Sequence, residues 1–334
     1  MDTIWVRVPP HAGVRHRRDW VHRPASRPQA ARAWRRCGRA RAHAQEGRRP
    51  AGFGLRDHRG DLSDADAIRR GVQARDAVFH AGATYKVGIR KSEHPAMQDT
   101  NVGGTERVLD ASIEARVPRI VYVSTGNVYG NTKGQVVDET YVRPQPPEFL
   151  SYYDRTKYEA HQAALERIAV GAPLVIVQPG GVYGPGDPSA LGNMIDQTRT
   201  GKLKLRMFPE AGFNFIHVED VADGILLAHD QGRIGESYNL AGEKATMGYL
   251  VDKTAALSGR KPPRVEMPAG LMKLGIPIGP VVGRLMGFPP NLSELIRTST
   301  GVTFWMTDEK ARAELGLHTR DLDSGLKQTL AAGG

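Results

Sequence analysis

The sequence predicts an α/β protein: a doubly wound, mainly parallel β-sheet with a smaller C-terminal lobe. The first observation is a series of short apolar strands that alternate with helical segments between residues 61 and 187. Such alternation is typical of parallel sheets. The second is that small or turn-forming residues follow these strands, as they do where parallel strands end beside a binding crevice. The third is a less regular order beyond residue 187, as expected for a substrate-covering lobe.

The elements follow one another at short, regular intervals. The stretch Gly60–Asp64 reads as a strand end followed by an N-cap signal, and it predicts a helix over about 64–73. We then expect strand 76–83, helix 95–115, strand 119–125, helix 151–168 and strand 173–178. Beyond residue 187 the expected elements are strands 213–218 and 237–241 and helices from 219, from Thr246 to about Leu257, and near 268–275, 291–299, 307–315 and 321–331.

Composition limits the class of protein. The 334 residues are enough for one large domain or two smaller ones. Cys37 is the single cysteine, which rules out an intrachain disulfide and favours a reducing, cytoplasmic location. The most apolar stretch, 269–288, carries Lys273, Arg284 and two prolines, so we expect a buried or lid segment there and no membrane span.

The net charge of +10 is concentrated at one end of the chain. Residues 1–60 contain 15 arginines, no lysine and 4 acidic residues, a net charge of +11. Residues 61–334 contain 31 basic and 32 acidic residues, a net charge of −1. The body of the protein is therefore near neutral, and we expect it to bind no nucleic acid.

A candidate proton-transfer set lies between Thr125 and Lys157. Thr125 ends a predicted parallel strand, while Tyr153 and Lys157 are four apart on the next helix and so share one face. A free tyrosine has a pKa of about 10, and a neighbouring ammonium lowers it, which would let Tyr153 exchange a proton with an alcohol or ketone. Thr125 would orient the substrate oxygen. The alternative is that Tyr-x-x-x-Lys is an accident of helix composition.

Seven short motifs carry a resemblance to a known family. In chain order they are Gly60-Asp-Leu62, His80-Ala-Gly-Ala83, Asn101-Val-Gly-Gly-Thr105, Val123-Ser-Thr-Gly-Asn-Val-Tyr-Gly130, Tyr153-x-x-x-Lys157, Val182-Tyr-Gly-Pro-Gly-Asp187 and Phe215-Ile-His-Val-Glu-Asp-Val-Ala222. From Asp61 onward the chain resembles an extended short-chain dehydrogenase/reductase of the NAD-dependent epimerase/dehydratase type. Its C-terminal half looks closest to the dihydroflavonol-reductase-like and hopanoid-associated epimerase-like branch.

The resemblance implies a Rossmann-type fold, NAD or NADP as cofactor, no metal, and Thr125, Tyr153 and Lys157 as the catalytic residues. It assigns further residues to the cofactor site: Asp61 and Leu62 at the adenine, Ala81, Gly82 and Ala83 near the pyrophosphate and ribose, Asn101 as a brace, Ser124 beside Thr125, and Pro179, Gly180 and Val182 at the nicotinamide. Alternatives stay open, because Asp61 could simply cap the next helix. We interpret His80 as a packed strand histidine, and His217 with Asp220 as a strand-to-helix corner.

The first sixty residues depart from the family. The resemblance calls for a strand and a Gly-x-x-Gly-x-x-Gly turn that aims a helix N-terminus at the pyrophosphate, and residues 1–60 contain no such pattern, although the length fits. A targeting peptide, a basic nucleic-acid-binding arm and out-of-frame translation are three explanations. The third accounts best for the abrupt change at 56–61. We therefore divide the chain into an anomalous segment 1–56, not natively ordered, a cofactor-binding domain 57–187, and a lobe 188–334 whose strand 213–218 could return to the sheet.

Two further departures bear on the reaction. The dehydratases of the family place Asp-Glu after the catalytic threonine, but this chain has Gly126 and Asn127, which disfavours dehydration. Gln178 stands where many sugar-nucleotide enzymes have arginine. We expect hydride transfer to or from a secondary alcohol or ketone, on a sugar or a dihydroflavonol- or steroid-like small molecule. The alternative is an inactive member without a cofactor loop. Helices 95–115 and 151–168 pair subunits in many relatives, which suggests a homodimer.

Overall fold

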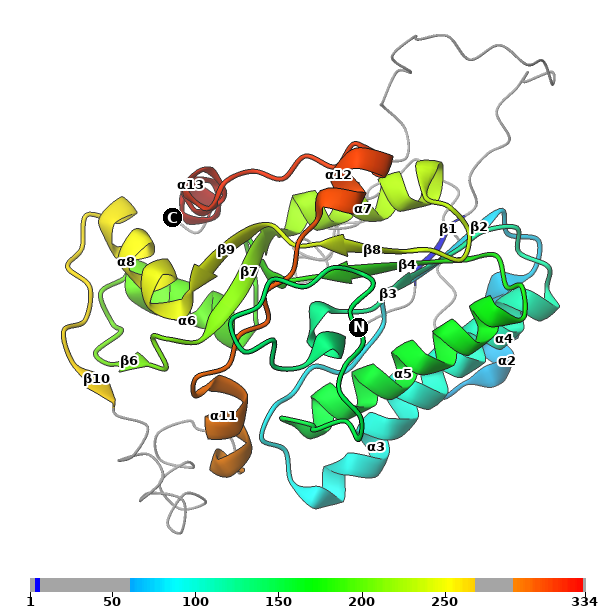
Figure 1. Ribbon diagram of the computed structural model, residues 1–334, viewed down its shortest axis with the longest axis horizontal. Coiled ribbons are helices and arrows are strands. Elements are labelled where there is room, and N and C mark those ends of the chain that lie inside the picture. The colour runs from blue at the N-terminus through cyan, green and yellow to red at the C-terminus, as the bar shows by residue number, and fades with distance from the viewer. Residues whose placement is uncertain (1–3, 7–60, 268–290, 333–334) are drawn as a thin grey trace, which may run out of the picture.

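The computed structural model describes residues 4–6, 61–267 and 291–332, and its centre is a five-stranded sheet (Figure 1). The strand order is β1-β2-β3-β4-β8. These strands are β1 (Ile4–Val6), β2 (Ala77–His80), β3 (Ile120–Val123), β4 (Leu174–Pro179) and β8 (Ser237–Leu240). The last four run parallel to one another. The predicted α/β class with a parallel sheet is confirmed.

Helices cover both faces of this sheet (Figure 1). One face carries α2 (Ala65–Val72), α4 (Gly104–Glu114) and α5 (Tyr152–Ala169), which share a buried cluster with the strands. The other face carries α7 (Val218–Gln231) and α12 (Glu309–Leu315). Both clusters consist mainly of Val, Ile, Leu and Ala, and each fully buried Val, Leu or Ile side chain contributes about 1.5–3 kcal/mol. The strands are apolar throughout because both faces are covered.

The helix predicted over 95–115 is divided into three segments. These are α3 (His94–Gln98), a π-helical turn η2 (Asp99–Gly103) and α4, and a 3-10 turn, η1 (Lys91–Glu93), precedes them. The wide turn places the Asn101 amide against the backbone of Thr84. A π-turn inserted in a helix often marks a functional site. The sequence pattern alone did not distinguish this interruption from a continuous helix.

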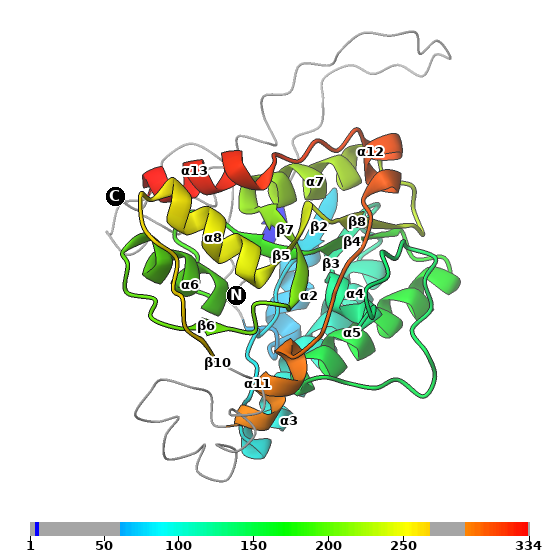
Figure 2. The same cartoon turned by 60° about the vertical axis from the view of Figure 1, so that its left-hand side comes forward.

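A second, three-stranded sheet builds the C-terminal lobe (Figure 2). Its strands are β5 (Gly181–Tyr183), β7 (Gly212–His217) and β9 (Glu243–Thr246). Strand 213–218, for which a return to the central sheet was left open, does not join that sheet, because β7 pairs with β5 and β9. Gly180 allows this divergence: a Cβ there would lie 2.4 Å from the Asn214 carbonyl oxygen. The chain can thus leave β4 and pass directly beneath β7.

The remaining elements surround this small sheet. Strands β6 (Arg206–Met207) and β10 (Glu266–Met267) form a short ladder, and helices α6 (Ala190–Arg199), α8 (Met247–Leu257), α11 (Leu292–Ser299) and α13 (Leu322–Ala332) complete the lobe. Thr246 caps α8 as predicted, through a hydrogen bond from the Tyr249 N–H. Strands β5 and β9 and helix α6 were not predicted. The predicted helix 268–275 and the apolar stretch 269–288 lie outside the described residues.

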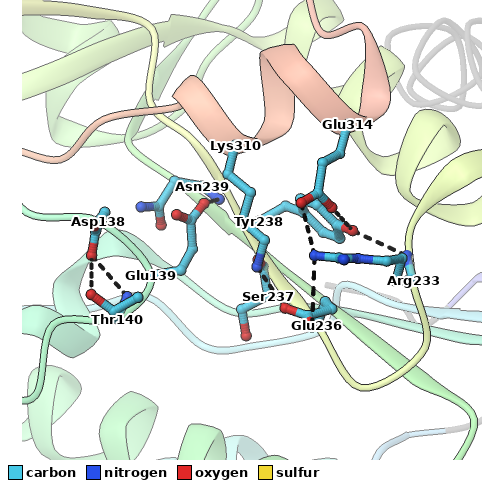
Figure 3. Close-up of polar contacts among 10 residues, drawn as sticks. All are labelled: Asp138, Glu139, Thr140, Arg233, Glu236, Ser237, Tyr238, Asn239, Lys310 and Glu314. Carbon is cyan, nitrogen blue, oxygen red and sulfur yellow. Dashed lines mark hydrogen bonds and ion pairs between the residues drawn. The ribbon is translucent and has the colours of Figure 1, made fainter.

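The outer edge of the central sheet, β8, is covered by polar side chains (Figure 3). The Asn239 N–H donates to Glu139 Oε1 at 2.6 Å, and Lys310 Nζ of α12 donates to the Ser237 carbonyl at 2.9 Å. The Tyr238 hydroxyl donates to Glu314, also on α12. Burial raises the pKa of Glu139, and its bond from the Asn239 N–H partly opposes that rise. Engaging the backbone N–H and C=O groups of an edge strand in this way protects it from pairing with another chain.

Most of the anomalous segment 1–56 lies outside the described residues, but β1 belongs to it. This strand pairs with β2 in the antiparallel direction, with Ile4 opposite Phe79 and Val6 opposite Ala77. Within the part of the chain that the structure describes, no helix is long and apolar enough to cross a bilayer.

Candidate active site

The carboxyl ends of β2, β3 and β4 meet at one edge of the sheet. Parallel registers place His80 beside Tyr122 and Val123 beside Val177, so the residues that follow these strands are neighbours. They are Ala81–Ala83 after β2, Ser124–Thr125 after β3 and Gly180 after Pro179, the last residue of β4. In open α/β sheets this edge is where ligands bind. Helix α5 brings Tyr153 and Lys157 to the same region.

Lys157 is a buried ammonium with few partners. The residue is 3% exposed, and Nζ donates to the Tyr122 hydroxyl and the Val123 carbonyl, both at 3.4 Å. No carboxylate among the described residues forms an ion pair with it. An ammonium has three N–H donors, and burying it without strong acceptors is costly. The hydroxyls of a cofactor ribose would supply the missing acceptors, and in this respect the site fits NAD or NADP.

Tyr153 is buried in an apolar setting with aromatic neighbours. It is 8% exposed, packs with Ile89 and Met97, and meets the Tyr85 ring edge-on at a centroid distance of 4.7 Å. Burial raises the pKa of Tyr153 above its ordinary value, and a hydrogen bond with Thr125 opposes this only in part. The expectation that Lys157 lowers this pKa is therefore wrong in this state. The reason is that burial dominates, while Nζ is directed at Tyr122 and Val123.

Thr125 and Ser124 follow β3 into a 3-10 turn, η3 (Gly126–Tyr129). Thr125 caps this turn by accepting the Asn127 N–H at 3.3 Å, and it is only partly buried. Ser124 is buried, and its Oγ lies 3.0 Å from His161 Nδ1. Burial and the nearby Lys157 charge lower the pKa of His161 to about 4. The imidazole is therefore neutral at physiological pH.

Asn101 links two segments that carry site residues. Its side-chain amide accepts the Thr84 N–H at 2.7 Å and donates to the Thr84 carbonyl and the Thr156 hydroxyl, each at 3.0 Å. The loop after β2, which contains Ala81–Ala83, is thereby joined to α5. This geometry is that of the brace expected from the resemblance, whereas direct contact of Asn101 with a cofactor stays a prediction.

The other predicted cofactor residues have clear structural roles as well. Asp61 is exposed and accepts the Ser63 N–H at 2.9 Å, while Asp64 is the side chain that caps α2. Leu62 is buried against Gly104, and its carbonyl accepts from Arg107. Gly180 donates its N–H to the Leu240 carbonyl, and Pro179 and Val182 flank it in β4 and β5. Their roles toward a cofactor stay predictions.

Two histidines were interpreted as packed structural residues, and their surroundings support this. His80 is fully buried, stacks on Tyr122 and bonds the Thr105 hydroxyl through Nε2 at 3.0 Å. Burial lowers the pKa of His80 to about 3. His217 caps α7 by accepting the Glu219 N–H at 3.2 Å. Asp220 is held by Arg320 instead of His217. The described residues contain no group of ligands suited to a metal ion.

The space beside Gly126 is occupied by the side chain of Met306, a residue that the sequence analysis did not connect with the site. A Cβ at this position would lie 2.9 Å from the sulfur of Met306. Met306 itself is buried and is held by its N–H bond to Asn214. A side chain at residue 126 therefore requires the Met306 side chain to shift. This adds a steric reason to the chemical one against elimination of water.

The pyrophosphate side of the site is different. In a doubly wound sheet the first strand pairs with the fourth, here β2, and runs parallel to it, so that its carboxyl end meets the crevice. The strand found on that edge of β2 is β1, which runs the opposite way. Val6, its last residue, lies opposite Ala77, at the far end of β2 from His80. The direction of β1 is therefore opposite to that of the first strand of a dinucleotide-binding sheet, and β1 itself does not fit the pyrophosphate-binding role.

Sequence reasoning missed three residues of the site: Tyr85, Tyr122 and His161. Of these, His161 had a signal, because Tyr153, Lys157 and His161 recur at intervals of four and share one face of α5. Tyr85 and Tyr122 reach the site through tertiary contacts that no local pattern encodes.

Comparisons with known proteins agree with this arrangement. The family described as the NAD dependent epimerase/dehydratase family matches residues 15–241, a range that begins inside the Arg-rich segment. Sterol demethylase protein B of Methylococcus capsulatus is 33% identical over 218 residues, 64% of each chain. A putative dihydroflavonol 4-reductase of Synechocystis is 30% identical, covering 81% of this chain and 78% of its own. The crystal structure of gox2253 superposes with a TM-score of 0.69 at 28% identity, covering 88% of this chain and 92% of its own.

The matched range contains the three strand ends, Thr125, Tyr153 and Lys157, so the resemblance read from the sequence is confirmed. The expectation of an enzyme lineage that uses NAD or NADP is confirmed at the level of the family. The chain belongs to the NAD-dependent epimerase/dehydratase family.

Proposed function

We propose that this chain reduces a ketone to a secondary alcohol, with Tyr153 as the proton donor. The observation that carries this proposal is the burial of Tyr153 beside Thr125, because burial raises the pKa of the phenol further above neutral pH and so favours its protonated form. A protonated phenol is the form that ketone reduction requires, since the carbonyl oxygen must gain a proton. Alcohol oxidation would instead require the phenolate.

The chain's own residues divide the work. Thr125 accepts or donates a hydrogen bond at the substrate oxygen and holds it within reach of Tyr153. Lys157, short of acceptors in its buried position, binds the ribose hydroxyls. Bound NADH or NADPH supplies the hydride. Tyr153 then delivers its proton to the same oxygen, and one C–H bond and one O–H bond form at the former carbonyl.

The residues around Tyr153 favour an apolar, ring-shaped substrate over a nucleotide sugar. Tyr85 is 50% exposed beside Tyr153, and Ile89 and Met97 extend the apolar wall. Gln178 is buried, and its neutral amide presents no charge to a diphosphate. Two relatives carry names that refer to a dihydroflavonol and a sterol. We therefore infer a dihydroflavonol- or steroid-like ketone; epimerisation of a sugar is the alternative within the same chemistry.

A second candidate function is that of a member that does not bind the cofactor. The antiparallel direction of β1 favours it, because the strand described beside β2 runs opposite to the strand that leads into a pyrophosphate-binding turn. This agrees with out-of-frame translation of residues 1–56. Reading the encoding DNA in the other two frames tests that origin: an apolar strand with a Gly-x-x-Gly-x-x-Gly turn leading into Asp61 supports it, and its absence from both frames refutes it.

One set of assays separates the two candidates. Purified protein is titrated with NADH and NADPH by fluorescence, and nucleotide oxidation is followed with a dihydroflavonol, a ketosteroid and a nucleotide sugar. Tyr153→Phe should lower turnover about 10²–10⁴-fold while nucleotide binding persists. Tyr158→Phe, which removes a hydroxyl one turn further along α5, is the matched control. Turnover that survives in Tyr153→Phe refutes the proposed mechanism, and failure to bind either nucleotide establishes the second candidate.

We also infer a homodimer formed through α4 and α5. Leu165 of α5 is 36% exposed, and Val170, the residue directly after this helix, is 83% exposed. A partner helix would cover these two apolar side chains. Light scattering after size-exclusion chromatography should give twice the mass of one chain, and Leu165→Glu should shift it toward the monomer. A single-chain mass for the wild type refutes the inference.

A further inference from the structure

Helix α11 of the C-terminal lobe contacts the two segments that surround the Tyr153 side chain. The Asn291 N–H donates to the Gly88 carbonyl at 2.8 Å, on the loop after β2. Glu294 Oε1 accepts the Tyr152 N–H at 2.7 Å. Arg297 Nε donates to the Leu150 carbonyl at 3.0 Å, just before α5 begins. The lobe is therefore joined directly to the first turn of α5.

Glu294 is the buried member of this set. Its residue is 2% exposed, and its other oxygen, Oε2, accepts from Asn291 Nδ2 at 3.2 Å. No basic side chain within the described ranges forms an ion pair with it. A buried carboxylate is costly unless it is hydrogen-bonded. The buried Glu294 carboxylate therefore depends on the Tyr152 N–H of α5 for one of its hydrogen bonds.

The α5 N-terminus gains equally from this contact. Tyr152 is the first residue of α5, and the N–H groups of a first helical turn have no acceptor within the helix. Ser151 caps the Asp154 N–H, which leaves the Tyr152 N–H for Glu294. The positive end of the helix dipole also favours a carboxylate at this point.

We propose that Glu294 is a positioning residue for the reaction: its carboxylate fixes the first turn of α5 and thereby holds the Tyr153 hydroxyl beside Thr125. The proposal rests on the proposed role of Tyr153. Through this contact the substrate lobe and the proton donor move as one unit. A bulky substrate bound in the lobe is thus aligned with Tyr153 through the hydrogen bonds between α11 and α5, and no separate closing movement is needed.

The contact is tested first without any turnover, by hydrogen exchange of peptides that span residues 150–156. Glu294→Ala should speed exchange of the Tyr152 amide about tenfold, because one hydrogen bond is lost. Glu294→Gln should speed it less, since a neutral amide oxygen accepts more weakly than a carboxylate. Ser293→Ala, at an exposed neighbouring position, is the control and should leave exchange unchanged. If Glu294→Ala fails to fold, Glu294→Gln alone decides, and wild-type exchange in that variant overturns the proposal.

Kinetics then distinguishes positioning from stability. We expect Glu294→Ala to lower kcat about tenfold or more. The KM for NADH or NADPH should change little, since Lys157 lies beyond the first turn of α5. Glu294→Gln should keep most of the wild-type kcat. A Glu294→Ala protein that melts earlier but keeps its kcat overturns the positioning role. If the wild type turns over no ketone, the proposed function fails, whereas hydrogen exchange still decides whether Glu294 orders the first turn of α5.

Discussion

We expect His161 to make the folded protein sensitive to acid, so replacing it should remove part of that sensitivity. The imidazole is buried, bonds Ser124 Oγ through Nδ1, and lies one helical turn from Lys157. Burial first, and the lysine charge second, lower the pKa of His161 from 6.5 to about 4. The unfolded chain binds a proton at this residue below about pH 6.5, but the folded chain does so only near pH 4. The contribution of neutral His161 to stability is therefore complete above pH 6.5 and is lost as the pH falls toward 4.

The size of the effect follows from the difference between the pKa of His161 in the unfolded chain and in the folded chain. One pKa unit corresponds to about 1.4 kcal/mol, so the free energy of unfolding should fall by about 3 kcal/mol between pH 7 and pH 4 on account of His161. His161→Asn keeps a polar group at the position of Nδ1 but has no proton to gain. Urea unfolding of both proteins, followed by circular dichroism at several pH values, measures the difference. His80, whose pKa is also low, is present in both and cancels. A difference in free energy that does not change with pH refutes the reasoning.

Three further predictions concern other parts of the described structure. Gly126→Asp should destabilise the protein by about 1–3 kcal/mol through collision with the Met306 sulfur, and adding Met306→Ala should restore part of this in chemical unfolding; a neutral single variant contradicts it. Asp154→Asn should cost about 3–5 kcal/mol, because it leaves the buried Arg143 without its bidentate partner at 2.8 Å, and an unchanged melting temperature would show that the pair contributes little. Glu139→Gln should be neutral or stabilising at pH 7. The folded pKa of Glu139 is raised, so the stability that its protonated form contributes is lost as the pH rises through that pKa. The melting temperatures of variant and wild type should therefore converge below about pH 4, and a difference that persists there contradicts this pH dependence.

Local sequence patterns predicted an element correctly wherever its own residues specify it. Thr246 was predicted to begin a helix, and it caps α8, because a threonine hydroxyl satisfies an N–H of the first turn wherever that turn is placed. The strands at 120–123 and 174–179 were predictable from continuous apolar runs, which are buried on both faces. Tyr153 and Lys157 were predictable as neighbours because helical periodicity alone puts residues four apart on one face.

Local patterns failed where the partner is distant in the chain. Strand 213–218 was expected to have the option of joining the central sheet, yet Gly180 and Asn214 approach so closely that it pairs with β5. The π-turn at Asn101 exists because its amide bonds Thr84 and Thr156, which lie 17 and 55 positions away. No window of sequence contains such a contact.

The sequence by itself determined the fold class, the three strand ends and the placing of Thr125, Tyr153 and Lys157 near one another, because these depend on residue type, on continuous apolar runs and on the four-residue spacing of a helix face. Only the tertiary structure decided how those residues behave. Burial between Tyr85, Ile89 and Met97 raises the pKa of Tyr153, against the local expectation that Lys157 lowers it. The reason is physical: the charge of a neighbour four residues away is encoded in the helix, whereas the loss of water around a hydroxyl is set by every segment that folds over it.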